Sequence, residues 1–199
     1  MSADMEVQGR SRNLGAYVTM LVASGLGLLA SLVLSVDAWK LAKDPNVKLS
    51  CNVNATINCG KVAVSWQSVI LGFPNAFLGL MAESIVLTVA IAALTGVHFT
   101  RLFMRIAQLG MVAGIGFAFW MFYQSYFNIG ALCPWCLVIT FTTTLLFFVF
   151  LRINILDNNF GLSDARQASL TRALRLNADA GVVLIVWAVM AAMILFHYA

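Results

Sequence analysis

Charged residues are scarce in this sequence. Asp, Glu, Lys and Arg make up only 10% of its 199 residues, whereas 61% are hydrophobic and the mean hydropathy is +0.90. Soluble domains carry about 25% charged residues and fewer apolar ones. The shortage of charge therefore excludes an ordinary soluble domain and indicates an integral membrane protein.

Histidine is rare, and the common nucleotide-binding motifs are missing. The two histidines, His98 and His197, lie at opposite membrane faces in the topology predicted below, so they cannot form one metal site with each other. The chain has no internal repeat, Walker motif or dinucleotide-binding fingerprint. It also has no basic patch interleaved with exposed aromatic residues, which argues against nucleic-acid binding.

Long apolar runs are present instead, and they predict an all-α integral membrane protein. A membrane-spanning helix needs about 20 apolar residues. Five segments meet this requirement: 14–36, 75–94, 106–127, 133–153 and 180–199. The first is too long for a signal peptide and lacks a cleavage site of small residues, so we expect an uncleaved first span. Residues 1–199 are thus predicted to form a single membrane domain.

The basic residues predict the orientation of these spans. All eight arginines fall in segments on the side of the N-terminus, and all four lysines fall in the loop of residues 37–74. Because cytoplasmic segments carry the excess of basic residues, we expect a cytoplasmic N-terminus in an inner or plasma membrane. This topology places all four cysteines on the outer side.

The four cysteines form two pairs of different spacing. Cys51 and Cys59 lie in the loop of residues 37–74, whereas Cys133 and Cys136 open the fourth span. Disulfides persist outside the cytoplasm, so two structural disulfides are one interpretation. The short Cys-x-x-Cys loop removes little chain entropy, and a helix N-terminus lowers the pKa of a thiol. We therefore favour a redox role for the second pair.

Local chemistry supports that role. Pro134 suits the first position of a helix, which makes Cys133 the N-cap, where the free N–H groups and the helix dipole stabilise a thiolate. Cys136 lies on the same face, about 4.5 Å deeper in the membrane. The pair is therefore predicted to pass electrons from a thiol on the water side to an apolar oxidant in the membrane, a quinone.

The first loop is predicted to hold the other half of a relay. The segment between Cys51 and Cys59 is rich in Asn and Thr and has no apolar anchors, so we expect it to be mobile. A mobile pair suits a shuttle between a soluble partner and Cys133. The alternative is a simple staple of the loop.

A short amphipathic helix is expected on the outer surface after Cys59. Four apolar residues in this region recur at helical spacing: Val62, Trp66, Val69 and Ile70. Such a stripe is typical of a helix that lies on the membrane surface.

This layout resembles the vitamin K epoxide reductase family, and specifically its bacterial homologues. The resemblance covers residues 14–153 and depends on the order of the motifs: a widely spaced loop pair, a surface helix, then Cys-x-x-Cys at the start of a transmembrane helix. Bacterial disulfide bond formation protein B has its two pairs in the reverse order. The resemblance implies a four-helix transmembrane bundle around a quinone, here with a fifth transmembrane helix.

The resemblance also implies roles for the four cysteines. Cys136 matches the cysteine nearest the quinone, and Cys133 matches its exchange partner. Cys59 matches the loop cysteine that attacks Cys133, and Cys51 matches the one that meets the partner protein.

Four further residues are candidates for supporting roles. The resemblance implies that Ser65 acts near the relay and that Asn75 hydrogen-bonds a quinone carbonyl. From the residues alone, Asn75 could equally be a helix N-cap and Ser65 an exposed hydroxyl. Glu83, a carboxyl inside the second span, either delivers protons or is a protonated, hydrogen-bonded group between helices. Trp135 either stacks on the quinone or anchors the membrane interface.

The resemblance implies a membrane thiol:quinone oxidoreductase that uses a menaquinone or ubiquinone. It would reoxidise a thioredoxin-like partner and so drive disulfide formation outside the cytoplasm. Several bacterial members carry their own thioredoxin-like domain after a fifth helix, whereas this sequence ends at Ala199, so we expect a separate, DsbA-like partner. The alternatives are a quinone or quinone-epoxide reductase that uses thiols only as reductant, and a non-enzymatic bundle with structural disulfides.

Overall fold

The computed structural model describes residues 2–198, with side chains from Asn13 to Phe196. Over this part of the chain it consists of helices and irregular connections, with two isolated β-bridges. Five of the helices are long and apolar enough to cross a membrane. The predicted all-α membrane fold with five spans is therefore confirmed.

The helices occupy the following ranges: α1 Ser2–Lys43, α2 Cys59–Ala63, η1 Trp66–Val69, α3 Ala76–Leu94, α4 Arg101–Tyr123, η2 Gln124–Ile129, α5 Pro134–Leu156, α6 Asp164–Arg175 and α7 Ala178–Tyr198. η1 is a 3₁₀ helix, and η2 continues α4 as a π-helix. The segments that could cross the membrane are Asn13–Lys43, Ala76–Leu94, Arg101–Ile129, Pro134–Leu156 and Ala178–Phe196.

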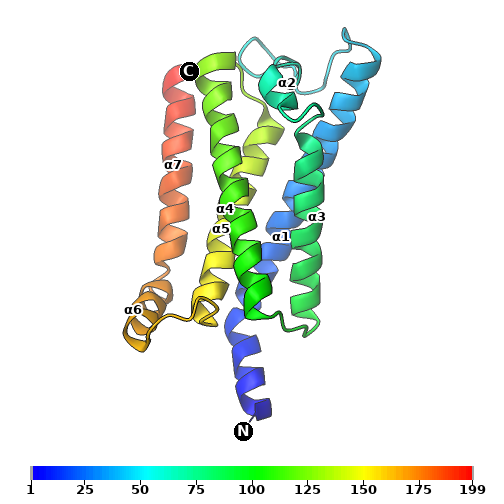
Figure 1. Ribbon diagram of the computed structural model, residues 1–199. Helices are drawn as coiled ribbons and strands as arrows, with labels where there is room; N and C mark the ends of the chain where they lie inside the picture. Colours follow the sequence, from blue (N-terminus) through cyan, green and yellow to red (C-terminus); the bar gives the residue numbers. More distant parts are fainter. Residues whose placement is uncertain (1, 199) are drawn as a thin grey trace.

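The five long helices form an upright bundle (Figure 1). α1 packs against α3 and α5, and α4 packs against α5, while α7 contacts α5 from outside this group of four. α2 lies at one end of the bundle together with the C-terminus, and α6 lies at the opposite end near the N-terminus (Figure 1). We call the end that carries α2 the cysteine end, because all four cysteines lie there. A buried apolar core, which includes Met20, Leu146 and Phe150, fills the space between the helices further along the bundle.

Small residues allow α1 and α3 to approach closely. A Cβ atom added to Gly27 of α1 would lie 2.6 Å from Cδ of Glu83 on α3, and one added to Gly79 of α3 would lie 2.6 Å from Oγ of Ser31 on α1. Both distances are too short for a real contact. A larger residue at either position would have to displace the facing side chain, so glycine suits this close packing, as in other membrane helix pairs.

The first helix is longer than predicted. We expected the first span to end near residue 36 and the outer loop to begin at residue 37, but α1 continues to Lys43. Hydropathy detects where the sequence stops being apolar. A helix can continue beyond that point, as α1 does here. The last predicted span, 180–199, reaches Ala199, which lies outside the described residues.

The predicted surface helix is broken into two pieces. α2 ends after Ala63 because the backbone of Ser65 is extended, with φ −71° and ψ 148°. Only Val62 of the predicted apolar stripe is buried, whereas Trp66, Val69 and Ile70 are exposed. The stripe therefore does not pack on the bundle as one face.

Candidate functional site

The fold brings the two cysteine pairs into contact. Cys51 and Cys59 form a disulfide, and Cys133 and Cys136 are free. Sγ of Cys133 lies 3.2 Å from Sγ of Cys59, although the two residues are 74 positions apart. Cys51, Cys59 and Cys133 are buried in one apolar cluster with Leu49, Val62 and Ala131. We call these six residues the cysteine cluster.

Backbone hydrogen bonds join the loop to the start of α5. Leu132 N–H donates to Thr56 O at 2.7 Å, and Asn58 N–H donates to Leu132 O at 3.0 Å. Cys59 directly follows Asn58, and Cys133 directly follows Leu132. Pairing of Asn58 with Leu132 therefore also brings the two cysteines close together. The contact between Cys59 and Cys133 follows directly from this pairing.

The segment between Cys51 and Cys59 has no buried apolar side chain, as expected, but it is anchored through its backbone. Leu49 and Cys51 are buried with 5% and 7% exposure, and only the tip around Val53 is open. The anchor for the segment, Leu132, comes from a distant part of the chain. A local composition rich in Asn and Thr could not indicate it.

Cys133 is the N-cap of α5 and Pro134 is at its first turn, as predicted. A hydrogen bond with the Cys136 thiol lowers the pKa of Cys133, and the backbone N–H groups of Cys136 and Trp135 act in the same direction. Burial and the Asp37 carboxylate oppose this effect but do not reverse it. The Cys133 sulfur is therefore the one of the free pair that favours the thiolate, and it faces Cys59.

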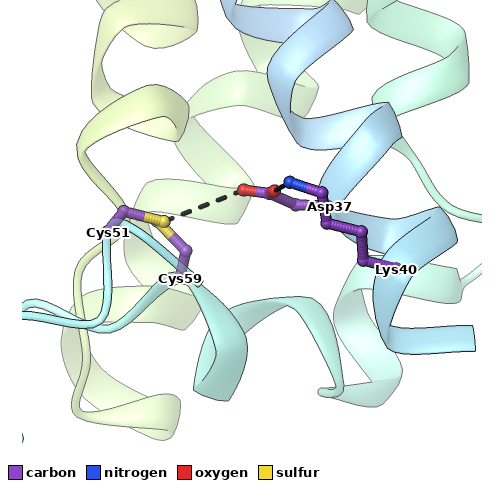
Figure 2. Close-up of polar contacts among 4 residues, drawn as sticks. All are labelled: Asp37, Lys40, Cys51 and Cys59. Carbon is purple, nitrogen blue, oxygen red and sulfur yellow. Dashed lines mark hydrogen bonds and ion pairs between the residues drawn. A yellow bond between two sulfur atoms is a disulfide. The ribbon is translucent and has the colours of Figure 1, made fainter. Parts of the chain in front are cut away.

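A buried carboxylate adjoins the disulfide. Oδ2 of Asp37 lies 4.0 Å from Sγ of Cys51, and Oδ1 lies 3.4 Å from Nζ of Lys40 (Figure 2). The sequence predicts that Asp37 lies in the loop of residues 37–74, and it did not indicate that Asp37 would contact a cysteine. A signal was available, because Asp37 lies at helical spacing between Leu34 and Leu41, both of which pack on the cysteine cluster.

An apolar cavity of about 540 Å³ begins at the cysteines and extends between α1, α3, α4 and α5. Cys59, Cys133 and Cys136 line it, whereas Cys51 does not. Its volume lies in the range of about 300–1,000 Å³ that is usual for pockets of small molecules. Three of the four cysteines therefore line the cavity, and Cys51 reaches it only through its disulfide with Cys59.

Asn75 lines the cavity at the start of α3. Its side chain does not cap the helix, which removes the capping interpretation. Instead, Nδ2 donates to Gln67 O at 2.6 Å and to Sδ of Met121 at 3.9 Å, while Oδ1 is buried without a hydrogen-bond partner among the described residues. Gln67, which is itself buried, donates through Nε2 to Oε1 of Gln124 at 3.3 Å. An unpaired amide oxygen accepts a hydrogen bond, so it fits a ligand with a hydroxyl group, such as a reduced quinone.

Glu83 also lines the cavity, further along α3. It is 5% exposed, and its Oε2 has no hydrogen-bond partner among the described residues. Eight residues of helix separate it from Asn75, or about 12 Å along the axis. The structure therefore places Glu83 in the same cavity but well away from Asn75.

Ser65 and Trp135 lie beside the site and do not line the cavity. The Ser65 hydroxyl donates to Val62 O at 2.7 Å, so it supports the end of α2. Trp135 is half-buried against the cysteine cluster. Thr140, four residues after Cys136, does line the cavity, and its hydroxyl donates to Cys136 O at 2.9 Å.

A comparison with protein families agrees with this geometry. A sequence model of the vitamin K epoxide reductase family matches residues 18–151, a region that contains all four cysteines and most of the four-helix group. No curated protein matches the chain. From the family match and the helical membrane fold, we conclude that the chain belongs to the vitamin K epoxide reductase family and is a membrane oxidoreductase.

Proposed function

We propose that the protein is a thiol:quinone oxidoreductase that reoxidises a thioredoxin-like partner and so drives disulfide formation outside the cytoplasm. One observation carries this proposal: Sγ of Cys133 lies 3.2 Å from Sγ of Cys59, beside a cavity of quinone size. Atoms that react with each other typically lie about 3–3.5 Å apart before reaction. Electrons can therefore pass between the pairs without a large movement.

The proposed relay consists of thiol–disulfide exchanges. A thiolate of the partner attacks Cys51, the bond from Cys51 to Cys59 breaks, and Cys59 leaves as a thiolate. Cys59 then attacks Cys133 of the oxidised Cys133–Cys136 pair, which releases the Cys136 thiolate at the cavity. Each exchange needs a thiolate, an accessible sulfur and a good leaving thiol.

The relay is completed by two further exchanges. The second thiol of the partner displaces Cys51, which then attacks Cys59 and releases Cys133. This sequence ends with a loop disulfide and two free thiols at Cys133 and Cys136, which is the arrangement in this structure. The two electrons of the partner are then held next to the cavity.

The residues of the cavity fit a quinone of the menaquinone or ubiquinone type. When bound, a quinone supplies an acceptor for two electrons and two protons. Asn75 would accept from a ring hydroxyl through Oδ1, and its Nδ2 could donate to a ring carbonyl in place of its weak acceptor, Sδ of Met121 at 3.9 Å. Cys136 would face the ring, and the apolar walls exclude water from it.

Access of the partner to Cys51 requires the loop to open. Cys51 is only 7% exposed and packs among Leu49 and its neighbours. Local opening of such a loop costs less than global unfolding. The tip of this loop, around Val53, is exposed and is the natural first contact for a DsbA-like protein.

The proposal is tested by mixing the purified protein with a reduced thioredoxin-like protein and a menaquinone or ubiquinone analogue. We expect loss of quinone absorbance together with oxidation of the partner, and neither with the Cys136→Ala variant. Reduction of quinone by dithiothreitol alone, with no reaction with protein thiols, would instead identify a quinone reductase. Absence of both reactions would indicate an inert bundle.

The predicted topology can be tested with two exposed positions at opposite ends of the bundle. Val53 is 70% exposed at the cysteine end, and Leu176 is 78% exposed after α6. In a cysteine-free protein, a Val53→Cys substitution should react with a membrane-impermeant thiol reagent in intact cells. Leu176→Cys should react only after the membrane is opened. The reverse pattern would place the cysteine end in the cytoplasm.

Asn75→Ala should weaken the use of quinone while leaving exchange between the partner and Cys51 intact. The expected loss is about 0.5–1.5 kcal/mol, the contribution of one hydrogen bond. It is measured as a rise in the apparent Michaelis constant for the quinone. Asn46→Ala, at an exposed position of the same end, is the control. An unchanged constant in folded Asn75→Ala protein would remove Asn75 from the quinone site.

A further inference from the structure

Asp37 is a buried carboxylate at the outer sulfur of the relay. It lies near the end of α1 with 4% exposure, and its Oδ2 is 4.0 Å from Sγ of Cys51. Figure 2 shows the carboxylate between Lys40 and the disulfide. Because the disulfide sulfur has no proton to donate, the 4.0 Å distance between Cys51 and Asp37 is a contact and not a hydrogen bond while the pair is oxidised. After reduction, the Cys51 thiol has an S–H group that can donate to Oδ2.

The groups that face Asp37 define its electrostatic effect. Lys40, on the same helix, forms an ion pair with it at 3.4 Å. The Lys40 side chain is 53% exposed, so solvent screens much of its charge. Cys51 approaches from the loop, and Cys133, at the start of α5, is close enough for the carboxylate to oppose its thiolate. A negative charge at Asp37 therefore disfavours a second negative charge nearby.

We propose that the Asp37 carboxylate keeps Cys51 protonated whenever the loop pair is reduced, and so directs the thiolate of that pair to Cys59. This inference rests on the proposed function, in which Cys59 is the sulfur that attacks Cys133. Asp37 thereby sets the direction of exchange within the loop pair.

The direction follows from the two possible attacks on the loop disulfide. Attack of a partner thiolate on Cys51 breaks the S–S bond and sends the electron pair to Cys59, which becomes a thiolate 3.2 Å from Cys133. Attack on Cys59 sends the electron pair to Cys51, and the new thiolate lies beside a carboxylate. A Cys51 thiolate beside a carboxylate is less stable than a Cys59 thiolate and is therefore the poorer leaving group. Attack of the partner on Cys51, which releases Cys59, is thus the faster reaction.

The same carboxylate serves the closing exchange. When Cys51 attacks the disulfide between Cys59 and Cys133, a new bond joins Cys51 to Cys59 and the electron pair goes to Cys133. The thiol proton of Cys51 passes to Oδ2 of Asp37 and then to water. No outside oxidant or reductant is needed, because the exchange conserves electrons.

The test is a pH profile of alkylation for each cysteine in the fully reduced full-length protein. Short pulses of iodoacetamide between pH 5 and pH 10 are followed by peptide mass spectrometry. In the wild type, Cys51 should have the higher midpoint of the two loop cysteines. Asp37→Asn should lower the Cys51 midpoint by about one pH unit, which is about a tenfold faster reaction below the midpoint, and should lower the Cys59 midpoint by clearly less.

Two variants control this result. Asp44→Asn removes an exposed carboxylate beyond the end of α1 and should change neither profile. Lys40→Gln removes the cation that offsets Asp37 and should move the Cys51 midpoint upward. Because Lys40 is half-exposed, this variant is expected to fold, and it keeps the test decisive where Asp37→Asn does not fold.

Identical Cys51 profiles in the wild type and in folded Asp37→Asn protein would overturn the proposal. An equal shift at Cys51 and Cys59 would also overturn it, because the effect would then lack direction. The alkylation requires neither quinone nor partner. A failure of quinone reduction therefore leaves this result readable, and the two proposals can fail separately.

Discussion

A Cys51→Ala, Cys136→Ala double variant should accumulate a disulfide between Cys59 and Cys133. The two sulfurs already lie 3.2 Å apart. The substitutions remove the only thiols that resolve this bond from either side, so the intermediate has no exit. Most of the protein should carry the bond after mild oxidation, as seen by non-reducing peptide mapping, and reductant should reverse it.

The matched variant Cys59→Ala, Cys136→Ala should behave differently. Here Cys51 remains beside Asp37, and Cys133 has lost the sulfur that it contacts. This protein should capture a thioredoxin-like protein in a mixed disulfide much more readily than it forms an internal bond. Equal internal cross-linking of Cys51 and Cys59 to Cys133 would show that the loop has no fixed order of exchange.

Gly27→Leu should destabilise the bundle much more than Gly25→Leu on the same helix. Gly27 is buried against the Glu83 side chain, whereas a Cβ at Gly25 meets nothing within 4 Å. A larger side chain at Gly27 must displace the buried Glu83 side chain or push α1 away from α3, and such overpacking costs about 1–3 kcal/mol. The thermal midpoint of the detergent-solubilised protein measures the difference.

A second substitution separates this packing effect from a general loss of helix stability. Glu83→Ala empties the space next to Gly27 and removes a buried oxygen that has no partner. In the Gly27→Leu protein it should restore much of the lost stability, so the two effects should not add. Strictly additive losses would show that Gly27 and Glu83 do not share the contact described here.

The sequence alone determined the class of fold and the helix start at which the second cysteine pair lies. Five apolar runs suffice to predict five spans, because a bilayer requires about 20 apolar residues from each helix. Pro134 and Cys133 define the start of α5 through strictly local geometry, and the structure has the same cap. The order of the cysteine pairs sufficed to indicate the family, and the family match agrees. These features depend on neighbouring residues in the chain.

Packing between distant segments decided the rest. The segment between Cys51 and Cys59 is held at the start of α5 because Leu132, far along the chain, supplies backbone partners for Thr56 and Asn58. Asn75 turned away from the helix end because Gln67 O accepts its hydrogen bond. None of these partners is a near neighbour within the same helix, so no helical or alternating pattern could indicate them.

The same reason explains the position of Asp37. Its sequence context is the polar end of an apolar run, and this context predicted a residue of the exposed loop. The structure buries it because α1 continues to Lys43 and because the loop folds back to place Cys51 against that last part of the helix. Hydropathy reports the preference of a segment for lipid or water. The tertiary structure alone shows that Asp37, and not another charged residue, lies beside the Cys51 sulfur.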